Sequence, residues 1–169
     1  TEITSWQGLD LMQTVGRVMA EYEGLPPSMR PSEILVDSIG VGGGVVDRLR
    51  ELGAPVRGIN VGEAPAMGKT HMNLRSELWF KTKGWLEDRS CKLPKDDQLL
   101  AELTAIRYSF TSSGKMKAES KDEMRKRGLK SPDLADALCL TMASDAATAL
   151  SGAMSSWKQT IKRNLKGIA

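Results

Sequence analysis

The stretch Glu33–Asp37 constrains the fold more than any other part of the sequence. It is a short apolar run closed by an acidic residue, which is typical of a strand buried in a parallel sheet. A glycine-rich turn over Gly40–Gly44 follows, then a predicted helix over Val45–Leu52, and Val56–Val61 has the pattern of the next strand. Strand, helix and strand within about 30 residues predict a right-handed β-α-β unit, and therefore an α/β fold.

The rest of the sequence alternates helical and extended patterns. Apolar residues at helical spacing predict a helix from about Asp10 to Glu23, which Pro26–Pro27 ends. Asn73 suits the N-cap of a long helix that reaches about Asp88. The other predicted elements are a short strand at Ile3–Gln7, a helix from Asp96 or Asp97 to Thr104, a hairpin of Arg107–Thr111 and Lys115–Glu119, a helix at Lys121–Arg127, and a last long helix from Pro132 to about Leu150 with Ser131 as its N-cap.

Composition indicates an ordinary soluble globular protein. The 169 residues favour one domain, over residues 1–150, followed by a basic tail over 151–169. The two cysteines, Cys91 and Cys139, do not suggest a disulfide framework, which favours a reducing compartment. No secretory signal is visible, and no apolar run reaches the roughly 18 residues that a membrane span needs. The sequence begins without Met, so a fragment of a longer protein is expected.

Three acidic residues are the candidate catalytic and metal-ligating groups. Asp37 ends the most strand-like run, at the strand end where parallel sheets place their ligands. Asp133 lies in the first turn of a predicted helix, and Asp136 lies three residues later on nearly the same face. Converging carboxylates need a cation between them, and oxygen-only ligands suit Mg²⁺ or Mn²⁺. The alternatives are that Asp37 is a turn residue and that Asp133 is an ordinary helix-start acid.

Three segments together resemble the C-terminal nuclease domain of phage large terminase subunits. Ile34–Leu49 looks like that family's second acidic motif, and Asn73–Trp79 resembles its helix after the third conserved strand. Glu119–Lys121 followed by Arg127–Leu138 looks like its closing motif. The resemblance runs from Trp6 to about Ala143 with the elements in the same order, which makes it more specific than any single motif.

The resemblance implies a fold and an activity. The fold is ribonuclease H-like, with a mixed central sheet and helices on both faces. The activity is a two-metal endonuclease, with Mg²⁺ or Mn²⁺ as cofactor, that cuts concatemeric double-stranded viral DNA during genome packaging in the cytoplasm of an infected bacterium. The implied partners are DNA, the portal or procapsid, the small terminase subunit and an upstream ATPase domain.

Carried onto this sequence, the family pattern makes Asp37 the second acid. Asp133 and Asp136 share the third position, with a slight preference for Asp133. The family's first acid lies on a strand that would precede Thr1, because Ile3–Gln7 looks like the third strand. The chain therefore lacks one acidic position, and a non-catalytic module that grips DNA and docks on the portal is the alternative function.

A basic stretch leads directly into Asp133. Lys115 to Lys130 holds seven basic residues and three acidic ones. Such a surface beside a carboxylate cluster would hold the DNA backbone, although a solvated charged helix is the alternative. The predicted DNA-binding residues are Lys115, Lys117, Lys121, Arg125, Lys126, Arg127 and Lys130.

Three other features carry weaker expectations. Gly62–Thr70 nearly matches a phosphate-binding loop, but five residues rather than four separate its glycines, so we expect an ordinary loop and disfavour a nucleotide-binding domain. His71, the only histidine, is expected at the surface. The tail from Ser151 is basic, with apolar residues at helical spacing, and is expected either to dock on the portal or procapsid or to be a disordered end.

Overall fold

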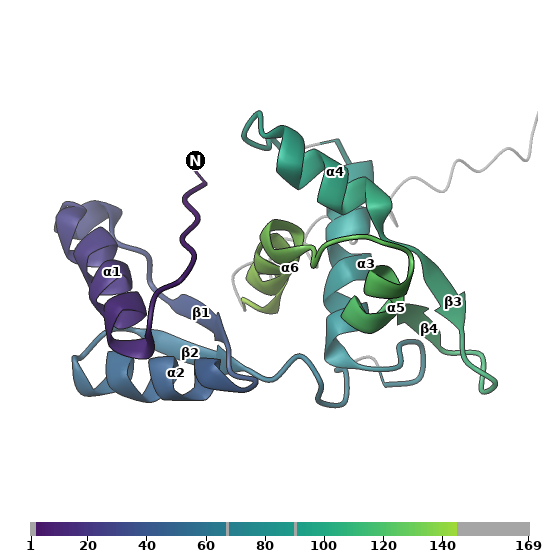
Figure 1. The fold of residues 1–169 in the computed structure, drawn as a ribbon, viewed down its shortest axis with the longest axis horizontal. Coiled ribbons are helices and arrows are strands. Elements are labelled where there is room, and N and C mark those ends of the chain that lie inside the picture. The colour runs from purple at the N-terminus through teal and green to yellow at the C-terminus, as the bar shows by residue number, and fades with distance from the viewer. Residues whose placement is uncertain (1–2, 67, 90, 145–169) are drawn as a thin grey trace, which may run out of the picture.

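Helices pack around one of two small sheets in the computed structural model, which describes residues 3–66, 68–89 and 91–144, and the other sheet lies at the edge of the molecule (Figure 1). In chain order the elements are α1 (Leu11–Gly24), the 3-10 turn η1 (Pro27–Met29), β1 (Ile34–Asp37), α2 (Val41–Glu51), β2 (Val56–Ile59), α3 (Leu74–Glu87), α4 (Asp97–Ala105), β3 (Tyr108–Phe110), β4 (Met116–Ala118), α5 (Lys121–Lys126), α6 (Asp133–Leu140) and the 3-10 turn η2 (Thr141–Ala143).

The parallel pair β1–β2 separates two apolar cores. Ile34 pairs with Val56 and Asp37 pairs with Ile59, so alternate side chains point to opposite faces. Ile34, Val36 and Val56 pack in the first core, against α1 and α2, around the fully buried Leu49. Leu35 and Ile59 pack in the second core, with residues of α3, α4 and α6. The β-α-β prediction is confirmed, and this strand pair has helices on both faces.

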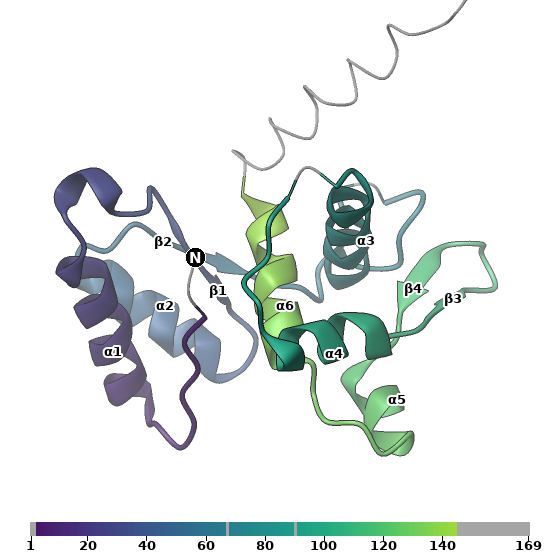
Figure 2. The same ribbon diagram turned by 90° about the horizontal axis from the view of Figure 1, so that it is seen from above.

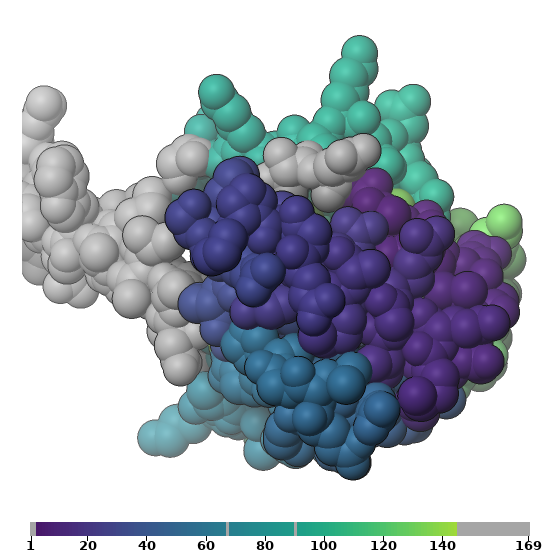
Figure 3. Space-filling model, turned by 90° about the vertical axis from the view of Figure 1, so that its left-hand side faces the viewer, coloured from purple at the N-terminus to yellow at the C-terminus, as the bar shows by residue number. Residues whose placement is uncertain are grey.

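The second core is built on α3, which packs against α6 and β4. Figure 2 shows α6 between the β1–β2 pair and α3, with α4 and α5 at one end of this group. The hairpin β3–β4 is antiparallel, as predicted, and pairs Tyr108 with Ala118. On the other side of the molecule, the N-terminal segment and α1 make up much of the surface seen in Figure 3.

The helix starts follow local capping signals. The Asp10 side chain accepts a hydrogen bond from the Gln13 amide, and the Gln13 side chain bonds back to the Asp10 amide. Asn73 and Asp96 cap α3 and α4 in the same way, through the amides of Ser76 and Leu99. These bonds satisfy amides that would otherwise lack partners at a helix N-terminus. The predictions for these three helices are confirmed to within one or two residues.

Two predicted features of the sheet are wrong. Within the described residues the strands form two separate pairs, β1–β2 and β3–β4, and not one mixed central sheet. Ile3–Gln7 forms no strand, and its backbone pairs with no strand in the described part of the chain. Instead Ile3 packs against the second core, and Trp6 is 36% exposed.

Two helix boundaries also differ from the prediction. Helix α2 begins at Val41 rather than Val45, so three of the turn's glycines lie inside the helix. A Cβ on Gly42 would stand 1.8 Å from the Asp37 carbonyl oxygen, so only glycine lets the helix start this close to β1. Helix α6 begins after Pro132 rather than Ser131, and its α-helical hydrogen bonding ends at Leu140 in a 3-10 turn. The predicted tail over 151–169 lies outside the described residues.

None of the helices within the described ranges combines the length and apolar character that crossing a bilayer requires.

Candidate functional site

The three predicted acids line one pocket. This acidic pocket, of about 360 Å³, lies between the carboxyl end of β1 and one side of α6. Asp37, Asp133 and Asp136 line it, together with Arg75 and Trp79 of α3 and Lys121 of α5. Elements that are far apart in the sequence therefore bring the acids together, because α6 packs against both β1 and α3.

Asp37 reaches the pocket from the last position of β1. It lies on the strand face that Leu35 also occupies, so it points to the α6 side of the sheet. Its side chain is exposed, and Oδ1 accepts a hydrogen bond from the Ile39 amide at 3.2 Å. That bond is the one a turn residue makes. It engages one carboxylate oxygen and leaves Oδ2 facing the pocket or solvent.

Asp136 is held by α3 through a single oxygen. Its Oδ1 accepts from Arg75 Nε at 3.1 Å and from Trp79 Nε1 at 2.8 Å, and Arg75 Nη2 lies 3.0 Å away. Arg75 Nη1 donates to the Glu119 carbonyl at 2.6 Å, which fixes the guanidinium in place. The Asp136 side chain is 20% exposed. Because these donors hold Oδ1, the second oxygen of the Asp136 carboxylate, Oδ2, is turned toward the pocket.

Lys121 Nζ lies between the two acids of α6. It is 3.3 Å from Asp133 Oδ1 and 3.4 Å from Asp136 Oδ2. The Ser131 hydroxyl also donates to Asp133 Oδ1 at 2.7 Å. This hydrogen bond, opposed by partial burial and assisted by the Lys121 charge, lowers the pKa of Asp133. The two carboxylates therefore share one cation, the protein's own ammonium group.

The acidic side chains that line the pocket offer the type of ligand atom that a hard divalent cation prefers. All three acids offer carboxylate oxygens, which Mg²⁺ and Mn²⁺ prefer. Lys121 shows that positive charge is favourable between two of them. Within residues 3–144 as described, no three His, Cys, Asp or Glu side chains are gathered closely enough to hold a metal ion. A metal centre here would require Lys121 to move away and a further oxygen donor.

Arg75 and Trp79 were not singled out from the sequence as site residues. They lie four positions apart on α3, so they share one helical face that looks toward Asp136. The signal that could have found them is their place in the segment Asn73–Trp79, which carried part of the family resemblance. A guanidinium group and an indole N–H require polar partners when they lie on a helix face that otherwise packs in the core.

The expectation for His71 is wrong, because its side chain is only 5% exposed. Its Nδ1 is 2.9 Å from the Thr70 hydroxyl, and its ring contacts that of Phe80 at 5.4 Å between centroids. The residue also forms an isolated bridge with Met116 of β4. It therefore fastens the hairpin to α3 and takes no part in the acidic pocket.

The seven predicted DNA-binding residues fall into two groups. Four form ion pairs with carboxylates: Lys117 with Glu123, Arg125 with Asp122, Arg127 with Glu119, and Lys121 with Asp133 and Asp136. Lys115, Lys126 and Lys130 have no ion pair within the described residues, and Lys126 and Lys130 are exposed. These three lysines are therefore the members of the set whose charge is not neutralised locally.

Solved structures give a consistent match. The nuclease domain of the large terminase subunit gp2 of bacterial virus Sf6 superimposes with a TM-score of 0.63 at 23% identity, covering 80% of this chain and 74% of that domain. A variant of that domain with manganese and β-thujaplicinol gives 0.64 at 22% identity, covering 82% and 74%. The large terminase nuclease from thermophilic phage G20c with bound magnesium gives 0.54 at 21% identity, covering 79% and 62%.

No protein-family model and no curated protein matches the sequence. The likeness is therefore one of fold: the chain has the fold of the nuclease domains of phage large terminase subunits. This confirms the resemblance that the order of sequence motifs indicated.

Proposed function

We propose that this protein is the nuclease module of a phage DNA-packaging terminase, a metal-dependent endonuclease that cuts concatemeric double-stranded DNA. The observation that carries the proposal is the acidic pocket, which Asp37, Asp133 and Asp136 all line, on a fold shared with terminase nucleases. In this proposal, a further strand that carries the family's first acid would complete a ribonuclease H-like sheet beside β1. Within the described residues β1 pairs only with β2, so its other edge is available for such a strand.

Each pocket residue has a role in the proposal. Asp37 and the two acids of α6 are the metal ligands, with Asp136 offering Oδ2 because its Oδ1 is held by α3. Arg75 and Trp79 are positioning residues, since they orient Asp136 rather than face the substrate. Lys121 neutralises the α6 carboxylates and would move toward a DNA phosphate when a metal ion replaces its charge. Two bound Mg²⁺ or Mn²⁺ ions would activate a water and stabilise the leaving oxygen.

The basic residues supply the proposed grip on DNA. Lys115, Lys126 and Lys130 would contact phosphates, because their charges are not neutralised by neighbouring acids in the described structure. Lys117, Arg125 and Arg127 would have to break an ion pair to do so, and Arg127 also donates to the Ala105 carbonyl. We therefore propose that these three contribute mainly to the shape of the hairpin and α5.

The partners of a packaging terminase form the rest of the proposal. An ATPase domain would precede this module, the small terminase subunit would bring DNA to it, and the basic tail over 151–169 would dock on the portal or procapsid. The work would take place in the cytoplasm of an infected bacterium.

A plasmid-nicking assay with Mn²⁺ tests the proposal. The chain as given and a version extended upstream are compared, each with Asp37→Asn, Asp133→Asn and Asp136→Asn, and with Asp47→Asn as a matched control. Asp47 is an exposed acid of α2 that pairs with Arg50, away from the pocket. We expect the extended protein to nick plasmid, the pocket variants to lose most activity, and Asp47→Asn to cut normally. Normal cutting by Asp37→Asn would show that the site assignment is wrong.

The non-catalytic gripping module remains the second candidate, and Lys121 favours it for the chain as given. Its ammonium already occupies the space between the two α6 acids. This candidate predicts that both versions bind DNA but that neither cuts it with any divalent metal. Calorimetric titration with Mn²⁺ separates the two candidates further, because only the nuclease predicts binding that Asp37→Asn weakens.

A further inference from the structure

A second cavity lies on the other side of Trp79 from the acidic pocket. This aromatic pocket, of about 450 Å³, is bounded by α3, α4 and the hairpin β3–β4. Trp79, Phe80 and Tyr108 provide three rings, and Leu86, Leu103 and Ile106 provide much of the remaining apolar wall. Its volume falls in the roughly 300–1,000 Å³ range of small-molecule sites. Trp79 lines both pockets.

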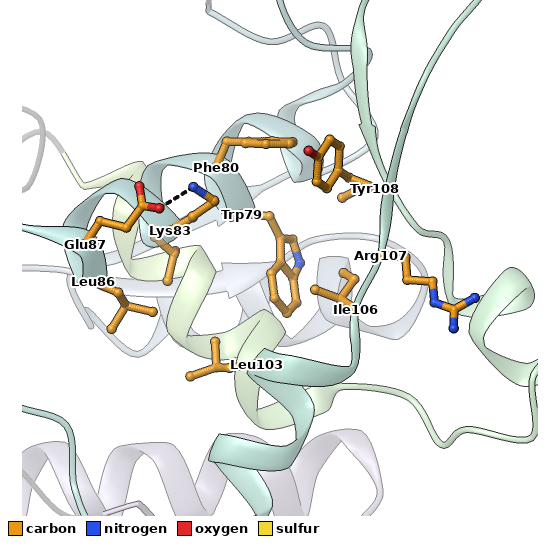
Figure 4. Close-up of a pocket in the computed structure, with 11 residues that line it drawn as sticks. Trp79, Phe80, Lys83, Leu86, Glu87, Leu103, Ile106, Arg107 and Tyr108 are labelled. Atoms are coloured by element: carbon orange, nitrogen blue, oxygen red, sulfur yellow. Dashed lines mark hydrogen bonds and ion pairs between the residues drawn. The ribbon is translucent and has the colours of Figure 1, made fainter.

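The rings are arranged at the mouth of the cavity as well as in its wall. Phe80 and Tyr108 meet edge to face, with 5.5 Å between centroids, and Tyr108 is 60% exposed. Figure 4 shows the rings of Trp79, Phe80 and Tyr108 around one space, with the ion pair of Lys83 and Glu87 at one side. An apolar space that a half-exposed aromatic ring borders is suited to a flat, ring-shaped ligand.

Positive charge lies next to this mouth. Arg107 precedes Tyr108 at the start of the hairpin, is exposed, and has no ion pair within the described residues. In Figure 4 its guanidinium points away from the cavity, so it would meet a group that stays outside while a ring enters. Lys83 and Glu87 also line the cavity; they are exposed and pair with each other, and they would offer a donor and an acceptor to the polar edge of that ring. A ligand that has a flat ring, a polar edge on that ring and an anionic group outside the cavity has the features of a nucleotide.

We propose that the aromatic pocket binds an unpaired nucleobase of single-stranded DNA, with Tyr108 stacking on the base and Arg107 contacting its phosphate. Base stacking on an aromatic side chain and a neighbouring cation is the common way of holding single strands. The inference rests on the proposed function only in taking DNA as the ligand. It adds a preference for unpaired DNA, at a pocket that shares Trp79 with the acidic pocket.

The test is a binding measurement without cutting. Fluorescence anisotropy in EDTA gives the Kd of the chain for a 12-nucleotide thymidine strand and for a 12-base-pair duplex. We expect Tyr108→Ala to weaken single-strand binding about tenfold, to leave duplex binding unchanged, and Tyr108→Phe to bind nearly as well as the parent. Arg107→Ala should make the plot of log Kd against log salt concentration less steep, by the amount expected for the loss of about one phosphate contact.

Phe110→Ala is the matched control. Phe110 lies on the same strand, is 65% exposed and contacts Tyr108, but it does not line the cavity. Equal losses from Phe110→Ala and Tyr108→Ala would overturn the pocket in favour of stacking along the hairpin surface. Unchanged DNA affinities in Tyr108→Ala and Arg107→Ala would also overturn it and point to a protein side chain as the occupant. The outcome is separable from the proposed nuclease, because binding in EDTA requires no metal, and Asp47→Asn, which lies outside both pockets, should bind normally.

Discussion

The indole Nε1 of Trp79 donates a hydrogen bond to Asp136 Oδ1 at 2.8 Å, and this bond joins the core of the protein to its acidic pocket. Trp79 is only 7% exposed, so its position is set by packing on α3. A carboxylate tied to a packed indole and to Arg75 cannot rotate freely, and a well-ordered ligand is what a metal site needs.

Trp79→Phe should therefore lower the free energy of unfolding by more than the loss of side-chain volume alone would. The change removes one hydrogen bond to a charged group, worth about 1.5–3 kcal/mol, in addition to the cavity left by the smaller ring. Trp85→Phe, on the same helix and partly buried, is the matched control for the volume change. Urea unfolding should show the larger loss for Trp79→Phe, and equal losses would mean that the bond to Asp136 contributes little.

Gly42→Ala should destabilise the protein by about 1–3 kcal/mol, the usual cost of overpacking. Its Cβ would stand 1.8 Å from the Asp37 carbonyl oxygen, so the start of α2 would have to move away from β1. Gly16→Ala in α1 is the control, because nothing lies within 4 Å of its added Cβ. That variant should gain about 0.5–1 kcal/mol in the free energy of unfolding. A thermal melt in which both variants shift in the same direction would contradict the close approach.

Glu123 should make stability depend on pH in the acid range. Its hydrogen bond with Lys117, followed by those with Ser120, lowers the pKa of Glu123 from 4.5 to about 2. Because the pKa is lower in the folded state, the stabilisation is fully present above pH 4.5 and is lost as pH falls toward about 2. The urea midpoint of Glu123→Gln should consequently converge on that of the parent over this range. Lys117→Met should raise the pKa of Glu123 in a carbon-13 NMR titration.

The two cysteines should react very differently with a thiol reagent. Cys139 is 2% exposed, and burial raises the pKa of its thiol to about 12, whereas Cys91 is half-buried. The thiolate is the reactive form, so the folded protein should be labelled at Cys91 alone. Mass spectrometry of the labelled chain checks this, with 6 M urea to expose Cys139. Labelling of Cys139 at the same rate in the native protein would contradict its place in the core.

Local signals were enough to predict most of the helices and the hairpin. Asp10, Asn73 and Ser120 cap helices through amides three residues away, so the relevant information lies within a few positions of sequence. The parallel strand pair was predictable for a related reason, because its apolar runs flank a short helix. The start of α2 was misplaced because glycines signal turns, and here Gly42 is required by a contact with β1.

The parts that could not be predicted depend on distant partners. The bond of Arg75 to Asp136 spans 61 positions, and the burial of His71 depends on Phe80 and on Met116 of β4. A strand at Ile3–Gln7 would have required its backbone to pair with a neighbouring strand, and the sequence pattern of a segment does not encode that partner. The three acids predicted from sequence line one pocket, whereas Lys121, which pairs with Asp133 and Asp136, was predicted only as a DNA-binding residue.

The thinness of the β1–β2 pair has a consequence for how the molecule unfolds. Within the described residues, its two strands lie between the core that contains Ile34 and Val36 and the core that contains Leu35 and Ile59. A slip of β1 by one residue would turn Ile34, Leu35 and Val36 each toward the opposite core. Neither core can consequently loosen by itself without disturbing the other, and we expect amide exchange to report a single cooperative unit that extends from Val15 to Cys139.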